Sequence, residues 1–373
     1  MGKEGRNPMI YLYAYPSAFQ NPGGGETLLL KTKEYLEKMG VEIKLFDLWT
    51  DRFKEGDLLH VFGSVKETLG LMQSAKSKGA KIVISPIIWY NWQSALHIPY
   101  NLSERLMCLL RQTIKSVFPQ APSDRKKMIQ LADAVLAGSH AEAWQIHRYF
   151  LIPKDSIHVI SYGADRCFDG ASPDLFYKRF GIRDFILTVG RVEPRKNQLN
   201  LIRAVREERH PLVVIGSLVS HHRNYYERCA RESYANVYFP GYLPIDSEEL
   251  RSAYAACSVL VIATWFETPS LAALEAGLAG AKVVITREGS TREYFKDYVK
   301  YVNPASVRDI REKVEETIQT PKTDALQNYI RKNYLWEHMA EKTLQVYKSL
   351  SQEVTPYQKI ENEMTQKTIQ VGR

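Results

Sequence analysis

Short apolar runs alternate with longer amphipathic stretches along most of this chain. A short apolar run bounded by turn residues is typical of a buried strand, and apolar residues repeating every three to four positions, as in Leu28–Met39, indicate a helix. The first half contains six such runs: Ile10–Tyr15, Glu42–Asp47, Asp57–Gly63, Lys81–Ile88, Ala134–Ser139 and Ile157–Gly163. The second half contains six more: Phe185–Gly190, Pro211–Gly216, Asn236–Gly241, Ser258–Thr264, Lys282–Thr286 and Val299–Asn303.

This alternation predicts an α/β protein made of two doubly wound, Rossmann-like domains that face each other across a cleft. We place the domains at residues 1–166 and 167–345, with the polar, turn-rich segment Ala164–Arg183 as the linker. Segment 346–373 is expected to pack back on the first domain, and a mobile tail after residue 350 is the alternative. Open α/β sheets bind ligands at the carboxyl ends of their strands, so the informative residues should follow strands.

Composition supports a globular protein and narrows its partners. The chain has 373 residues, with 45% apolar and 25% charged, and contains no apolar run long enough to span a membrane. The polar N-terminus has no signal-peptide core, so we expect a cytoplasmic protein. Four scattered cysteines (Cys108, Cys167, Cys229 and Cys257) favour neither a zinc site nor a disulfide framework. The net charge of +8 indicates anionic partners, but the basic residues are spread out, so nucleic acid is not expected.

The stretch Trp265–Gly277 follows the predicted strand Ser258–Thr264 and carries two carboxylates. Thr268 is predicted to cap a helix whose first residue is Pro269, which would leave the next backbone amides free to bind an anion. Glu267 lies just before this helix end. Glu275 lies six residues after Pro269, about 9 Å along the axis at about 1.5 Å per residue. Hydroxyls of a sugar and of a ribose could be bound at these two carboxylates; the alternative is simple pairing with the helix dipole.

A basic loop, Gly190–Asn197, follows the first strand of the second half. Arg191 and Lys196 lie five residues apart across a turn held by Pro194, where two cations can clamp a diphosphate and stabilise it as a leaving group. Asn197 is predicted to cap the next helix. The alternative is a solvated basic loop, which we favour for Arg195.

A glycine-rich loop, Asn21–Glu26, follows the first strand of the first half. Its three glycines permit close backbone approach to a ligand, and the next helix offers amides. The pattern is not GxGxxG and no acidic residue occupies a ribose position, so NAD is not expected. A flexible turn without a ligand is the alternative.

Together these motifs resemble the retaining GT-B glycosyltransferases of family GT4 (glycosyl transferases group 1). The resemblance covers nearly the whole chain and is strongest over residues 185–304. Its main marks are Glu-x7-Glu at Glu267 and Glu275, Gly-Arg…Lys-Asn at Gly190–Asn197 and Gly-Gly-Gly-Glu at 23–26. Supporting marks are Ile160–Asp165, where Tyr162 replaces the usual Asn, and Trp336 and Tyr347 in the last predicted helix.

The resemblance implies a role for each of these residues. Arg191 and Lys196 would hold the donor diphosphate, Glu267 the hydroxyls of the donor sugar, and Glu275 the ribose hydroxyls. Other donor-binding residues would be Gly24 and Gly25 at the diphosphate, Gly190, Thr268 and Pro269 beside it, the amides of Ser270 and Leu271 at the distal phosphate and sugar, and Gly216, Tyr242 and Leu243 at the base.

The chain also departs from the family pattern. Members commonly read Glu-Gly-Phe-Gly-Leu where this chain reads Glu267-Thr268-Pro269-Ser270-Leu271, so Ser270 replaces a glycine close to the sugar. Many members carry a histidine after the fourth strand, which is absent from Ser85–Trp92, and His97 lies too late in the loop. Trp89, Tyr90 or Trp92 are expected to shape the acceptor side instead.

The activity implied is transfer of a hexose-type sugar from a nucleotide-diphosphate sugar to a glycan or lipid-linked acceptor, with retention of configuration. Cell-surface polysaccharide or glycoconjugate synthesis is the implied setting. The chain has no Asp-x-Asp, and Arg191 and Lys196 can neutralise the diphosphate, so we expect no metal and no cofactor. A GT-B nucleotide-sugar epimerase and a non-catalytic nucleotide-sugar-binding subunit are the alternatives.

Residues 89–127 combine aromatic and leucine residues with six basic ones. Such a stretch can lie on an anionic membrane surface, which would place the protein peripherally at the inner face of the membrane. The alternative is an ordinary core-facing helix with a solvated basic face.

Overall fold

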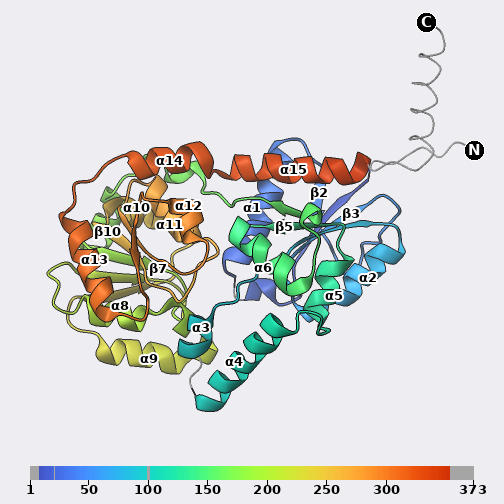
Figure 1. Ribbon diagram of the computed structural model, residues 1–373. Helices are drawn as coiled ribbons and strands as arrows, with labels where there is room; N and C mark the ends of the chain where they lie inside the picture. Colours follow the sequence, from blue (N-terminus) through green and yellow to red (C-terminus); the bar gives the residue numbers. More distant parts are fainter. Residues whose placement is uncertain (1–7, 21, 99–100, 353–373) are drawn as a thin grey trace, which may run out of the picture.

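The computed structural model describes residues 8–20, 22–98 and 101–352 and contains two α/β halves side by side (Figure 1). Each half has one sheet of six parallel strands, in the orders β2-β1-β3-β4-β5-β6 and β12-β11-β10-β7-β8-β9. All twelve predicted strands are present. Most are a few residues shorter than predicted, because the polar or turn-forming ends leave the ladder; Pro86, for example, follows the end of β4 and has no amide to donate.

The first sheet is covered on both faces by helices. Its strands are β1 (Ile10–Tyr13), β2 (Ile43–Leu45), β3 (Leu58–Phe62), β4 (Lys81–Ser85), β5 (Ala134–Ala137) and β6 (Ile157–Val159). One face packs against α1 (Gly24–Lys38) and α15 (Trp336–Gln352), and the other against α2 (Leu69–Ser77), α5 (Asp124–Leu131) and α6 (His140–Phe150). The central strands β3, β4 and β5 are almost wholly apolar because both of their faces are buried.

The second sheet has the same plan. Its strands are β7 (Ile186–Val189), β8 (Leu212–Ile215), β9 (Val237–Gly241), β10 (Val259–Ile262), β11 (Val283–Thr286) and β12 (Lys300–Val302). One face packs against α7 (Asp174–Phe180), α10 (Glu248–Ala256), α11 (Leu271–Leu278), α12 (Thr291–Phe295) and α14 (Ala325–Asn333). The other packs against α8 (Gln198–Ala204), α9 (Arg223–Glu232) and α13 (Val307–Gln319).

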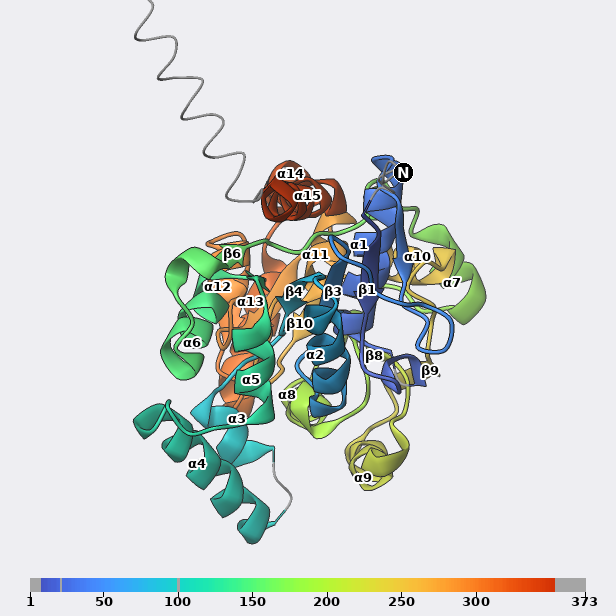
Figure 2. The ribbon, with the colours of Figure 1, turned by 90° about the vertical axis from the view of Figure 1, so that its right-hand side faces the viewer.

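Two helices, one short and one long, project from the first half beside the second. They are α3 (Trp92–His97) and α4 (Leu102–Val117), which pack on each other below the body of the molecule in Figures 1 and 2. Within the described residues, no helix is both long and apolar enough to cross a membrane.

The chain passes between the halves twice, and the two passages lie side by side. Ala164, on the outward passage, pairs with Leu335 on the return, and its amide donates to the carbonyl of Tyr334 at 2.9 Å. Gly163 makes this approach possible, because a Cβ there would lie 2.3 Å from the carbonyl carbon of Leu335.

The segment predicted as the linker, Ala164–Arg183, is largely part of the second half. Phe168 and Phe176 are buried in the core beneath the second sheet, and α7 forms within the segment. Its polar turn residues therefore bound a packed helix rather than a free linker. The returning chain packs on the first half from Trp336 onward, earlier than the predicted residue 346, and residues 353–373 lie outside the described residues.

Candidate active site

A cavity of about 580 Å³ lies where the carboxyl ends of the two sheets face each other. Its wall contains every residue that the sequence predicted for the donor site: Gly24, Gly25, Gly190, Arg191, Lys196, Gly216, Tyr242, Leu243, Glu267, Thr268, Pro269, Ser270, Leu271 and Glu275. These residues come from loops after β1, β7, β8, β9 and β10, so the position of the cavity follows the general rule for open α/β sheets. Their binding and catalytic roles stay predictions.

Lys196 and Glu267 form an ion pair in this cavity. The Lys196 Nζ donates to Glu267 Oε1 at 2.8 Å. The residue Glu267 is buried, with an exposed fraction of 5%. Burial lowers the pKa of Lys196, while the neighbouring Glu267 favours its charged form. A Cβ at Gly190 would lie 3.2 Å from Lys196 Cε, so glycine at this position leaves room for the lysine side chain. The pair therefore presents a fixed cation beside a fixed carboxylate.

Glu193 links the two arginines of the basic loop. Its Oε2 lies 3.4 Å from Arg191 Nε, and its Oε1 accepts from Arg195 Nε at 3.2 Å. Burial alone would raise the pKa of Glu193, but Arg195 and Arg191 hold it below its usual value. Arg195 also lies 3.9 Å from Glu267 and lines the cavity. The expectation of a solvated Arg195 was wrong, because the turn at Pro194 directs it back over Glu193 and Glu267.

The loop after β11 holds Glu267 by its backbone. The Glu267 amide donates to the Glu288 carbonyl at 3.2 Å, and the Ser290 amide donates to the Glu267 carbonyl at 2.9 Å. Gly289 lies between them with φ of 104°, and a Cβ there would lie 2.0 Å from the Glu267 oxygen. The sequence analysis missed this support. A glycine closely following a buried strand was the only signal for it.

The predicted start of α11 was wrong by two residues. Ser270 is the N-cap and accepts from the Ala273 amide, whereas Thr268 and Pro269 precede the helix in a bend. Because Glu267 is tied to the β11 loop, the chain cannot turn into a helix until it has passed Pro269. The Ser270 hydroxyl, which differs from the family glycine, therefore caps the helix that faces the cavity.

Glu275 lies inside the cavity wall, one turn into α11. Tyr254 donates its hydroxyl to Glu275 Oε2 at 2.9 Å. Burial raises the pKa of Glu275 to about 7. The charge of this carboxyl therefore changes near neutral pH.

The glycine loop of the first half faces the second half across the cavity. Gly24 and Gly25 are the first residues of α1, and Glu26 turns back to accept from the Gly23 amide at 2.8 Å. A Cβ at Gly23 would lie 3.5 Å from Arg191 Nη1, and one at Gly24 would lie 3.8 Å from Leu271 Cδ1. The α1 N-terminus is thus held close to the basic loop and to α11.

Asn197, predicted as a side-chain cap, has another role. Its side-chain amide donates to the carbonyls of Ala263 and Pro304 at 2.8 and 2.9 Å, and it does not cap α8. Its backbone is left-handed, with φ of 57°, which turns the basic loop into the helix. Asn197 therefore fixes the loop to the segments that follow β10 and β12.

The first half supplies an aromatic and basic wall. Trp89 and Arg125 line the cavity, and Arg125 donates to the Tyr90 hydroxyl at 3.0 Å. Tyr90 and Trp92, the other expected acceptor-side residues, lie outside the cavity lining. His97 also lies outside it, with its ring stacked on Trp265 at a centroid distance of 4.4 Å. Arg125 was not predicted, because its place in the wall depends on how α5 packs.

Residues 178–336 match the family model "Glycosyl transferases group 1". This match covers most of the second half of the chain, which is therefore similar to that family. An uncharacterized glycosyltransferase of Methanocaldococcus jannaschii is 29% identical over 225 residues, which are 53% of this chain and 55% of that protein. The serotype-specific mannosyltransferase WbdA of Escherichia coli is 29% identical over 205 residues, 50% of this chain and 24% of WbdA. The chain thus spans about half of the first relative and a quarter of the second.

Solved glycosyltransferases share the fold over nearly the whole chain. A glycosyltransferase of Rickettsia africae has a TM-score of 0.66 at 14% identity, covering 94% of this chain and 100% of its own. Sucrose-phosphate synthase of Thermosynechococcus elongatus has a TM-score of 0.66 at 16% identity, covering 92% and 99%. Anabaena HepE, solved in complex with UDP and glucose, has a TM-score of 0.65 at 15% identity, covering 92% and 99%. The two halves of the chain therefore form a GT-B fold, as predicted.

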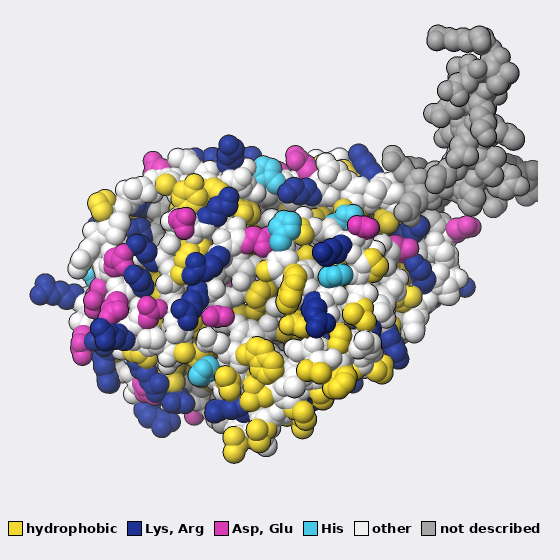
Figure 3. Space-filling model, viewed as in Figure 1, with side chains coloured by type: hydrophobic (Ala, Val, Ile, Leu, Met, Phe, Trp, Pro, Cys, Tyr) yellow, Lys and Arg dark blue, Asp and Glu magenta, His cyan; other side chains and the backbone are white. Residues whose placement is uncertain are grey.

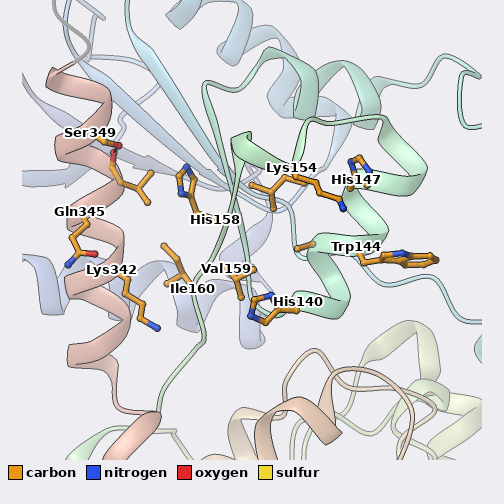
Figure 4. Close-up of a pocket in the computed structure, with 13 residues that line it drawn as sticks. His140, Trp144, His147, Lys154, His158, Val159, Ile160, Lys342, Gln345 and Ser349 are labelled. Atoms are coloured by element: carbon orange, nitrogen blue, oxygen red, sulfur yellow. Dashed lines mark hydrogen bonds between the residues drawn. The ribbon is translucent and has the colours of Figure 1, made fainter.

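A second hollow, of about 850 Å³, lies between α6, β6 and α15. Figure 4 shows His140, His147, His158, Lys154 and Lys342 around it. Its lining contains none of the predicted site residues and no carboxylate, so it lacks the cation–carboxylate pairing found in the cavity between the two halves. No cluster of three potential metal-ligating side chains occurs among residues 8–20, 22–98 and 101–352.

Proposed function

We propose that this protein is a glycosyltransferase that moves a hexose-type sugar from a nucleotide-diphosphate sugar to a glycan or lipid-linked acceptor. One observation carries the proposal: Arg191, Lys196, Glu267 and Glu275 all line one cavity between two Rossmann-like domains. The similarity of residues 178–336 to the group 1 glycosyltransferases supports the same reaction class. Cell-surface polysaccharide or glycoconjugate synthesis in the cytoplasm is the proposed setting.

The donor diphosphate would lie between the basic loop and the start of α11. Lys196 and Arg191 would neutralise the leaving nucleoside diphosphate, a large contribution to catalysis in a site that excludes water. Gly190 and Gly216 support this arrangement, because a Cβ at Gly216 would lie 1.9 Å from the Gly190 oxygen. Only glycine lets the ends of β7 and β8 come so close beneath the phosphates.

The two glutamates would hold the two sugars of the donor. Glu267, rigid through its backbone bonds to Glu288 and Ser290, would accept from hydroxyls of the transferred sugar. Glu275 would accept from the ribose hydroxyls, and Tyr242 and Leu243 would flank the base. The donor would thus be held at its transferred sugar and at its ribose before the acceptor binds.

We propose retention of anomeric configuration through front-face attack, in which the departing phosphate helps to accept the acceptor's proton. Glu267 pairs with Lys196 and would position the sugar rather than act as a nucleophile. The positive charges of Arg191 and Lys196 can do the electrostatic work on the diphosphate, so activity should persist in EDTA.

The direct test measures nucleotide release from a panel of UDP-, GDP- and ADP-sugars, with and without sugar and lipid-linked acceptors. Thermal shift with UDP, GDP and ADP identifies the nucleotide first, since a bound nucleotide stabilises the fold by mass action. Lys196→Ala and Glu267→Ala should each lower turnover by about a thousandfold, the range seen for removal of one transition-state contact.

Lys313→Ala provides a matched control. Lys313 pairs with Glu316 at 2.7 Å on the outside of α13, far from the cavity lining. This variant should keep full turnover. Wild-type turnover in Lys196→Ala or Glu267→Ala would refute the site, and an epimerised donor formed without acceptor would identify an epimerase. Tight nucleotide binding without release under any condition would identify a binding subunit.

A further inference from the structure

The helix α4 has the opposite orientation to an ordinary surface helix, because its apolar side faces solvent rather than the protein. None of its residues is buried, and its large apolar side chains face solvent. Their exposed fractions include 69% for Leu102, 58% for Leu106, 54% for Leu110 and 60% for Val117. The core-facing interpretation of this stretch was therefore wrong, because the apolar side points away from the protein.

The polar side of α4 faces the protein instead. Gln112 Nε2 donates to the Asn91 carbonyl at 2.8 Å, and Lys115 Nζ lies 3.7 Å from the centroid of the Phe150 ring. Burial, together with Lys126 and Arg125, lowers the pKa of Lys115 to about 8. Polar inward contacts thus fix the helix with its apolar side outward.

The apolar side is broad and continuous with α3. At about 100° per residue, Leu102, Leu106, Val117, Leu110, Ile114 and Met107 span an arc of about 140°, interrupted only by Ser103 and Thr113. Trp92 and Leu96 on the adjoining α3 are also exposed. Figure 3 shows hydrophobic side chains gathered along the lower rim of the molecule, where α4 lies. A helix that pairs with one other helix needs only a narrow apolar stripe. The width of the apolar side of α4 therefore favours contact with an extended apolar environment.

The charge of the surrounding chain indicates what this apolar environment is. Between residues 89 and 127 there are six basic side chains against two acidic ones: Arg105, Arg111, Lys115, Arg125, Lys126 and Lys127 against Glu104 and Asp124. Arg111, Arg125 and Lys127 are exposed. Basic residues beside an apolar helix face are attracted to anionic lipid headgroups.

We infer that α4 and α3 form a membrane-docking surface that inserts Leu102, Leu106, Leu110, Ile114 and Trp92 into the headgroup region of an anionic bilayer. This surface contacts the two segments that hold Glu267 in place: Asn91 donates to Glu288 Oε2 at 3.1 Å, and His97 stacks on Trp265. Resting on the proposed function, the docking would place the acceptor side of the cavity at the bilayer and select a lipid-linked acceptor.

Vesicle sedimentation of the full chain tests this directly. The wild type should bind vesicles of equal phosphatidylcholine and phosphatidylglycerol, and bind pure phosphatidylcholine at least about tenfold more weakly. The triple variant Leu106→Ser, Leu110→Ser, Ile114→Ser should lose at least about tenfold in binding to the anionic vesicles. Because these side chains already face water, the variant should keep the wild-type melting temperature.

A matched control replaces exposed apolar residues elsewhere. Leu45, Leu48 and Trp49 are 41%, 47% and 86% exposed and lie around the end of β2. Changing all three to serine should leave vesicle binding intact. If the first triple variant does not fold, Arg111→Glu supplies a second test, with an expected severalfold loss confined to anionic vesicles.

Several outcomes would overturn the proposal. These are a wild type that stays in the supernatant with anionic vesicles, an α4 triple variant that binds as the wild type does, or equal loss in both triple variants. A wild-type dimer that the α4 variant converts to a monomer in light scattering would assign the surface to a second copy. Vesicle binding needs no donor, so its outcome is independent of whether nucleotide release is observed.

Discussion

At the scale of single residues, Glu275 has the most informative chemistry. Its carboxyl lies in the cavity wall and accepts from the Tyr254 hydroxyl at 2.9 Å. Burial makes ionisation costly, so the pKa rises from 4.5 to about 7. A bound ribose would supply further donors and make the ionised form easier to hold. A nucleotide bound through its ribose would therefore lower the cost of ionising Glu275.

We predict that Glu275→Gln flattens the pH dependence of stability. Below pH 4.5 the carboxyl is protonated in both the folded and the unfolded chain, and it adds no cost. As the pH rises to 7, the unfolded chain ionises first, so the wild type loses up to about 3 kcal/mol of stability relative to the variant. Melting temperatures at pH 5 and pH 8 without nucleotide measure this, and equal shifts in both proteins would contradict it.

Other residues show what a sequence can and cannot predict about a site. The types and spacing of Arg191, Lys196, Glu267 and Glu275 were enough to place them in one cavity, because all follow strands of one parallel sheet. Arg195 and Gly289 were missed. Their importance depends on backbone approach and side-chain direction between residues that are distant in the sequence, 72 positions for Arg195 and Glu267 and 22 for Gly289 and Glu267, which no local pattern encodes.

At the scale of elements, α15 belongs to a different half from the helix before it. Tyr347 of α15 reaches β3, where its hydroxyl lies 2.6 Å from His60 Nδ1, and the other ring nitrogen lies 2.9 Å from Ser85 Oγ. Burial lowers the pKa of His60 to about 3, so the ring stays neutral and depends on these two partners. A polar network thus fixes α15 in register on the first sheet.

Tyr347→Phe should lower the stability of the protein by about 1–3 kcal/mol. The substitution keeps the ring but leaves a buried histidine nitrogen without its partner. Tyr177→Phe is the matched control, because Tyr177 is 40% exposed and should tolerate the change within about 0.5 kcal/mol. Urea unfolding of both variants measures the effect, and equal midpoints would show that the network contributes nothing.

The elements themselves were predictable where the pattern was strong. Each of the twelve apolar runs forms a strand, six in each predicted half. This was predictable because buried parallel strands need continuous apolar residues. The pattern was weaker for helices whose environment is unusual. The amphipathic period of α4 was visible in the sequence, but the direction of its apolar side is set by Gln112 and Lys115, which pack inward.

At the scale of the whole molecule, several hydrogen bonds join the two halves beside the double passage. Tyr294 of α12 donates its hydroxyl to the Gly138 carbonyl and accepts from the Tyr162 amide at 2.9 Å. Glu293 accepts from the amides of His140 and Ala141 at the start of α6, where the helix dipole favours a carboxylate. One edge of the interface is therefore tightly bonded.

Gly163→Ala should destabilise the protein by several kcal/mol, because its Cβ would meet the backbone of Leu335 at 2.3 Å. Gly70→Ala is the control: a Cβ there meets nothing within 4 Å, and alanine is the better helix former. Differential scanning calorimetry should show a lower melting temperature for Gly163→Ala and an unchanged or higher one for Gly70→Ala. A wild-type melting temperature in Gly163→Ala would show that the two passages separate without cost.

We expect the paired passages at Ala164 and Leu335 to act as a hinge between the two halves. They lie beside α14 and α15 at one rim of the molecule, while α3 lies at the opposite rim in Figures 1 and 2. A small rotation about this hinge would displace α3 most, because α3 lies furthest from it. The rotation would therefore separate the stacked rings of His97 and Trp265 before it broke the hydrogen bonds near the hinge. If the first half rests on a bilayer through α4, the second half would rotate about this hinge and open the cavity beside the lipid.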